Sequence, residues 1–149
     1  MEFPIPESLK AEHDEFRGKL VQVAREKGRL GSGAAALLRA LKPHGAREEE
    51  FAFPPLSLLF PLAGGRLSVE MGDVLSLTDK MKQELPSLLA EHSTIVTALR
   101  KFKEAALEEK RQDCADLADR IITHIQSEED ILYPVSILIG EYVKLKLGR

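Results

Sequence analysis

The chain carries two copies of one histidine–acidic motif, and this duplication constrains its fold more than any other feature of the sequence. The copies span residues 44–54 and 124–134. Each has the order His-x-x-x-Glu-Glu-(Glu/Asp), followed by an aromatic residue and a proline, and corresponding positions lie 80 residues apart. The sequence therefore predicts a tandem duplication of one structural unit.

A second repeated string lies upstream of each copy and supports the same conclusion. It has the order Ser-Leu-x-Ala-Glu-His and ends at His13 in the first half and at His92 in the second. The chain has 4 histidines, and the two repeated patterns account for all of them. Each half thus contributes one single histidine and one His-x-x-x-Glu pair.

Apolar residues recur at steps of three or four, which is the period of amphipathic helices. Prolines and glycines mark the expected helix ends and bends. The predicted helices cover Pro6 to about Lys27, Ala34 to Phe53 with a kink at Pro43, Val69 to Glu108 with a bend at Pro86, and a last helix through His124. This pattern predicts an all-α, antiparallel four-helix bundle in which one helix pair repeats the other.

Two apolar segments remain outside the four helices. Leu56 to Leu62 is too apolar for a solvated loop, and Val135 to Leu147 keeps a helical period beyond Pro134. We expect them to pack against each other over one end of the bundle. A dimer contact is the alternative, so the expected state is a monomer or a homodimer.

Length and composition exclude several classes of protein. The 149 residues most simply form one domain, residues 1–149, and a net charge of −3 offers no electrostatic basis for binding nucleic acid. No apolar stretch is long enough to span a membrane. The single cysteine, Cys114, allows no internal disulfide and fits a reducing compartment. With no secretory signal at its start, the chain is expected to be cytoplasmic.

The motif places six polar side chains on the apolar faces of the helices. Residues four apart project from the same face of a helix, so His44 lies with Glu48, and His124 with Glu128. Buried carboxylates without partners would cost several kcal/mol each, and a metal centre would satisfy them. Imidazole and carboxylate together suit iron, zinc, copper or nickel, and also manganese. The predicted metal ligands are His13, His44, Glu48, His92, His124 and Glu128.

These residues and their spacing resemble the hemerythrin-like (HHE cation-binding) family, over nearly the whole chain from about Pro6 to Leu147. The resemblance implies a hemerythrin-like bundle that holds two iron ions joined by an oxo or hydroxo bridge, with zinc as an alternative occupant. It also implies that Glu48 and Glu128 bridge the irons. In such a site His13 and His44 serve one iron, and His92 and His124 serve the other.

One position departs from the oxygen-carrying members of the family. These have a further histidine four residues after the histidine of the third helix, where this chain has Val96; the repeat equivalent is Arg17. The histidine set therefore leaves both irons similarly accessible. Reversible oxygen transport is disfavoured.

The resemblance implies a protein that binds or senses oxygen, nitric oxide or the redox state of iron through open iron positions. Its ligand would be a diatomic molecule or an anion, and a sensor would need a separate output protein. The alternatives are a di-iron enzyme acting on peroxide, nitric oxide or ferrous iron, and a bundle whose metal is only structural. No catalytic residue beyond the ligands is predicted. Ideal helical geometry turns Tyr133, Glu49 and Glu129 away from the ligand face, which predicts packing for the tyrosine and solvation for both glutamates.

Overall fold

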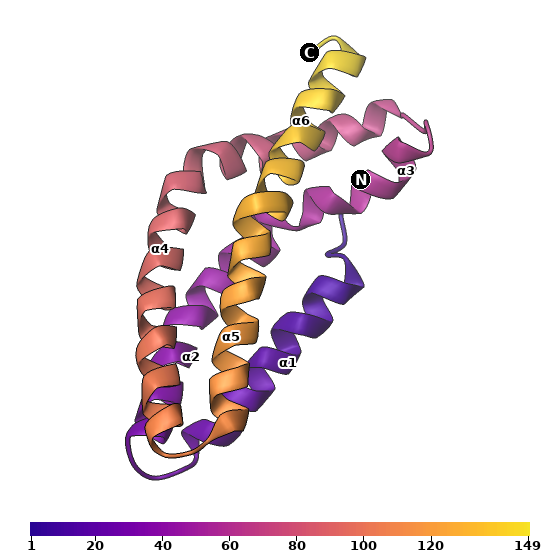
Figure 1. Ribbon diagram of the computed structural model, residues 1–149. Coiled ribbons are helices and arrows are strands. Elements are labelled where there is room, and N and C mark those ends of the chain that lie inside the picture. The colour runs from indigo at the N-terminus through magenta and orange to yellow at the C-terminus, as the bar shows by residue number, and fades with distance from the viewer.

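The computed structural model describes residues 1–149 and confirms the predicted all-α bundle. Four long helices lie side by side in antiparallel order (Figure 1). They are α1 (Glu7–Ala24), α2 (Arg29–Arg47), α4 (Leu75–Glu108) and α5 (Gln112–Ser127). Shorter elements are the π-helices Glu48–Ala52 and Glu128–Leu132, the 3₁₀-helices Pro54–Leu58 and Val69–Val74, and the helices α3 (Leu59–Ala63) and α6 (Tyr133–Leu147). None of the helices combines the length and the apolar character needed to cross a membrane.

Helix α2 begins earlier than the glycines of its first turn suggest. It starts at Arg29 instead of Ala34, because only Gly28 breaks the chain, with a φ of 94°. Gly31 lies inside the helix, where a Cβ atom would approach the carbonyl oxygen of Glu26 to 1.9 Å. A glycine at this position therefore lets the turn between α1 and α2 pass close to the first turn of α2; it does not end a helix.

The third long helix also differs from the prediction at its start. Residues Val69–Val74 form a 3₁₀-helix, and α4 follows from Leu75 and continues through Pro86. The apolar segment after Pro134 forms α6, which extends beyond the bundle in line with α5 (Figure 1). Its Ile139 and Val143 share an apolar cluster with Leu56 and Leu58, as predicted for these two segments.

The interior is divided into two apolar clusters. One holds residues such as Leu37, Ile95 and Ile121, and the other holds residues such as Phe51 and Leu88. On α2, α4 and α5 the histidines lie where the helix passes from one cluster to the other. A layer of polar side chains thus separates two dry regions of the core.

Both copies of the motif contain the same distortion of the helix. A π-helix begins at Glu48 and another at Glu128, each of 5 residues. Each closes with a bond from the sixth residue back to the first, from the N–H of Phe53 to the carbonyl of Glu48 and from Tyr133 to Glu128. A π turn accommodates one extra residue, so every side chain after it is rotated relative to an ideal α-helix.

Candidate metal centre

All six side chains that the sequence singles out meet in this polar layer. His44, His92, Glu48 and Glu128 are each no more than 2% exposed, and His124 is also buried. His13 is the least enclosed, with 12% of its side chain exposed. They come from α1 (His13), α2 (His44), α4 (His92), α5 (His124) and the two π-helices (Glu48 and Glu128).

Their ligand atoms form two groups, and within each group all of these atoms lie within 4.8 Å of one another. The first group has both carboxylates and two imidazoles, from His44, Glu48, His92 and Glu128. The second is His13, His124 and Glu128, so that Glu128 belongs to both groups.

The imidazoles are grouped across the duplication, whereas the family resemblance implies pairs within each half. The ring centroids of His44 and His92 lie 4.6 Å apart, and those of His13 and His124 lie 5.0 Å apart. This grouping does not follow the most extensive helix packing, because α1 packs mainly against α2 and α4 against α5, whereas α1 and α5 make little contact.

Carboxylates outside the six hold the far side of three imidazole rings. The Nδ1–H of His44 donates to Glu91 at 3.2 Å, that of His92 to Glu129 at 3.3 Å, and that of His124 to Glu12. A proton on Nδ1 leaves the Nε2 atom of a neutral ring free to bind a metal. The sequence analysis missed Glu12 and Glu91, although both belong to the repeated string that ends in histidine.

The prediction that Glu129 is only a solvated charge is wrong. It lies in the second π-helix, one residue after Glu128, and accepts a hydrogen bond from His92. Its counterpart Glu49 has no such bond and lines a cavity described below. Ideal helical geometry turns both away, so the contact of Glu129 could not be predicted from spacing alone.

Tyr133 packs in the second apolar cluster, as predicted, but its hydroxyl also reaches the polar layer, which its spacing does not predict. Nine residues separate it from His124, which places it on the opposite side of an ideal helix at ~100° per residue. The intervening π turn takes up one residue and returns the ring to the polar layer. Its hydroxyl donates to Glu48 Oε2 at 2.5 Å and lies 3.1 Å from Nε2 of His92.

The two buried carboxylates differ in their protonation. Burial, reinforced by the neighbouring charge of Glu128, raises the pKa of Glu48 to about 7. Burial also works against ionisation of Glu128, but hydrogen bonds from His124, His13 and His92 outweigh it and hold the pKa well below its usual value. Burial lowers the pKa values of His44 and His124, whereas the neighbouring glutamates raise them. The effect of the glutamates is the larger, so both pKa values are raised. Burial raises the pKa of Tyr133, so its phenol remains a donor.

The residues present fit a metal ion. Nε2 of His44 is buried and has no hydrogen-bond partner, which is costly for a polar atom in a protein interior. The Nε2 atoms of His13 and His124 face each other at 3.1 Å, an arrangement that needs a proton or a cation between their lone pairs. Nitrogen and carboxylate donors in this number suit a transition metal.

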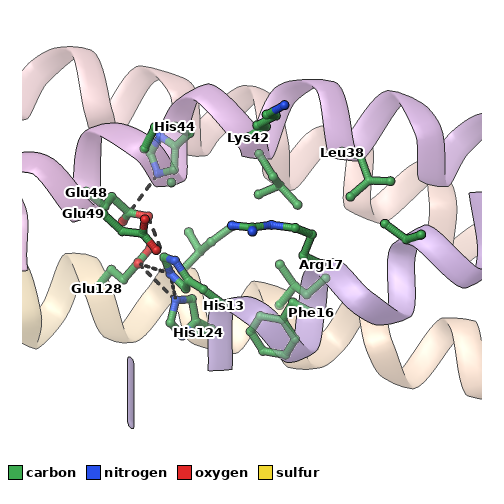
Figure 2. Close-up of a pocket in the computed structure, with 16 residues that line it drawn as sticks. His13, Phe16, Arg17, Leu38, Lys42, His44, Glu48, Glu49, His124 and Glu128 are labelled. Atoms are coloured by element: carbon green, nitrogen blue, oxygen red, sulfur yellow. Dashed lines mark hydrogen bonds and ion pairs between the residues drawn. The ribbon is translucent and has the colours of Figure 1, made fainter. Parts of the chain in front are cut away.

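A cavity of about 530 Å³ leads to this cluster from one side. Figure 2 shows His44, Glu48 and His13 at one end of it, with Arg17 and Lys42 farther along. It lies between α1 and α2, and it touches five of the six predicted residues, all but His92.

The other half of the molecule has a smaller cavity, of about 320 Å³, which reaches only His92 among the six. Val96 lies in its wall. The large cavity is bordered by Gly45 and Ala46, whereas the equivalent positions carry Ile125 and Gln126. Side-chain size therefore opens one side of the layer more than the other. The large cavity reaches residues of both ligand groups, so similar accessibility of the two metal positions stays a prediction.

The fold and the site together define an antiparallel four-helix bundle with a buried histidine–carboxylate cluster suited to a metal. The family model of the hemerythrin HHE cation binding domain matches residues 5–136. The chain therefore belongs to the hemerythrin HHE family, as the duplicated motif predicts. No curated protein and no solved structure matches it at a significant level. Family and cluster together fit a metal-binding protein.

Proposed function

We propose that this domain binds two iron ions and that small molecules bind at coordination positions which the protein leaves open. The observation that carries the proposal is the buried, unpartnered Nε2 of His44 beside two groups of imidazoles that share Glu128. Imidazole and carboxylate ligands suit iron, and zinc is the expected substitute. The proposed ligands are His13, His44, Glu48, His92, His124 and Glu128.

An iron pair, when bound, supplies one-electron chemistry and open positions for a diatomic molecule or an anion. The protein's own residues orient and enclose the pair. Glu12, Glu91 and Glu129 hold three imidazole rings by their Nδ1–H groups. The two apolar clusters exclude water above and below the layer. These features favour binding or sensing of oxygen, nitric oxide or the redox state of iron, with a separate protein as the output.

The large cavity gives such a ligand its path. Arg17 and Lys42 line it and are both exposed, so their positive charges favour the approach of anions. Phe16, Leu38 and Leu41 make much of its remaining wall apolar, which suits uncharged diatomic molecules.

Metal analysis tests the proposal. The protein is purified from cells grown with ample iron, and its metal content and absorption are measured under argon, air and nitric oxide. We expect two irons per chain and a spectrum that changes with each gas. Protein that holds one metal or none after reconstitution with ferrous iron would refute the proposal.

The second candidate function is a di-iron enzyme, and the size of the cavity is the observation that favours it. About 530 Å³ is far more than the roughly 30 Å³ that a water-sized molecule occupies in the liquid. Steady-state consumption of peroxide, nitric oxide or ferrous iron by the iron-loaded protein would support the enzyme. A single stoichiometric reaction would support the binding protein.

A further inference from the structure

Tyr133 is placed to act on one carboxylate of the cluster. Its side chain is 1% exposed, and its hydroxyl donates to Glu48 Oε2 at 2.5 Å. The ring stacks on His92, with an interplanar angle of 13° and centroids 5.4 Å apart. A buried hydrogen bond to a carboxylate is among the stronger ones in proteins, so this contact fixes the orientation of Glu48.

The duplication supplies an internal comparison, because the equivalent of Tyr133 is Phe53. Phe53 is equally buried and meets His13 edge to face, with ring centroids 5.2 Å apart. It has no hydroxyl to offer Glu128, the counterpart of Glu48. The phenol is thus the one hydrogen-bond donor at these two positions, and it breaks the symmetry of the layer.

The grouping of the ligand atoms follows this asymmetry. Glu128, without a phenol, lies 3.0 Å from Nε2 of His124 and 3.1 Å from Nε2 of His92, and it belongs to both groups. Glu48, with Oε2 held by Tyr133, is grouped with His44 and His92, and its other oxygen, Oε1, lies 3.7 Å from Nε2 of His13.

We infer that Tyr133 is a positioning residue which makes the two metal positions inequivalent by holding one oxygen of Glu48. The inference rests on the proposed function. The position at His44 and His92 has two carboxylates, whereas the position at His13 and His124 has one. Divalent metal should therefore fill the first position before the second. The expected gap between the two affinities is about 10–100-fold, the usual effect of a change in outer hydrogen bonding.

The test titrates metal-free protein with Co²⁺ and follows visible absorption and heat. The wild-type protein should bind two ions in separate steps. In Tyr133→Phe the steps should merge, and in the exchanged variant Phe53→Tyr/Tyr133→Phe they should separate again. If Tyr133 only filled space, moving the hydroxyl to position 53 would not restore the separation of the two binding steps. Phe53→Tyr alone places a phenol at both equivalent positions, 53 and 133, and should also merge the two binding steps. This variant keeps the test decisive if Tyr133→Phe does not fold.

Tyrosine emission supplies an independent readout, since the chain has 2 tyrosines and 0 tryptophans. In a Tyr142→Phe background the emission of Tyr133 should change during the first step of Co²⁺ binding. Two equal affinities in the wild-type protein, or separate steps that persist in both Tyr133→Phe and Phe53→Tyr, would overturn the inference while leaving the proposed metal site intact. Failure of the wild-type protein to bind Co²⁺ or iron would instead refute the proposed function.

Discussion

His44 on α2 and Glu91 on α4 are joined by a hydrogen bond of 3.2 Å, and Arg47 holds the same carboxylate at 2.5 Å. The duplicated half repeats the first of these contacts between His124 on α5 and Glu12 on α1. Each bond crosses from one half of the chain to the other. The carboxylate that precedes a histidine in one half thus orients the second histidine of the other half.

Removing this carboxylate should weaken metal binding without removing a ligand. In Glu91→Ala the His44 ring loses its Nδ1 partner, and we expect metal affinity to fall about 10–100-fold. Competition with a coloured chelator measures the change. Glu104→Ala is the matched control, because Glu104 lies exposed on the same helix and forms no ion pair. An equal loss in both variants would contradict this role of Glu91.

The two central carboxylates should differ in their importance. Glu128 belongs to both ligand groups and Glu48 to one, so Glu128→Ala should lose more metal than Glu48→Ala. Metal content per chain after identical reconstitution and desalting measures the difference. A larger loss in Glu48→Ala, or an equal loss in the two variants, would show that Glu128 does not serve both metal positions.

Metal removal should lower the stability of the bundle. A ligand at a hundredfold excess over its Kd stabilises the folded state by about 2.7 kcal/mol. For a chain of this size that corresponds to roughly 5–10 °C in Tm. Calorimetry before and after chelation, with loss of metal verified, measures it. Hydrogen exchange should quicken most in Glu48–Ala52 and Glu128–Leu132, and identical melting curves would show that the cluster needs no cation.

The sequence was sufficient for the bundle, the duplication and the six central residues, because each depends on a period that repeats along the chain. It was insufficient wherever the period changes. The π turns at Glu48 and Glu128 alter the angle of the residues that follow, so ideal helical spacing does not predict the hydrogen bonds of Tyr133 and Glu129. The grouping of imidazoles across the duplication is a relationship between different helices, and spacing within one helix carries no information about it.

The metal-free protein should become less stable as the pH rises through neutrality. The pKa of Glu48 is raised to about 7 in the folded protein. Its contribution to the free energy of unfolding is therefore complete below the pKa of the carboxyl group in the unfolded chain, and it is lost as the pH rises through about 7. The raised pKa values of His44 and His124 act in the same direction. The lowered pKa of Glu128 acts oppositely, since its contribution is lost only as the pH falls into the acid range.

Chemical unfolding of metal-free protein at about pH 5 to 8 measures this dependence, which follows from proton linkage. In Glu48→Gln the slope should be shallower, because the side chain no longer ionises. Glu104→Gln is the control and should keep the wild-type slope. A free energy of unfolding that rises with pH across this range would contradict the assigned direction.

Small anions should reach the cluster mainly through the large cavity between α1 and α2. Ala46→Trp narrows the large cavity, and Gln126→Trp makes the equivalent change at the small one. We expect Ala46→Trp to slow azide binding to the iron-loaded protein about tenfold, an increase of about 1.4 kcal/mol in the barrier. Gln126→Trp should leave the rate near that of the wild-type protein. Stopped-flow absorption measures both, and equal rates in the two variants would refute access from one side.

The polar layer between the two apolar clusters also restricts how the four helices can align. A slip of α2 by one turn, about 5.4 Å, would put one member of the His44–Glu48 pair in the place of the other and move the remaining one among apolar residues. An ionised carboxylate there would lose its partners at a cost of several kcal/mol. Stripes of uniform leucine would tolerate such a slip, since one apolar contact can replace another. The six side chains that are proposed to hold the metal therefore also disfavour competing registers of the bundle.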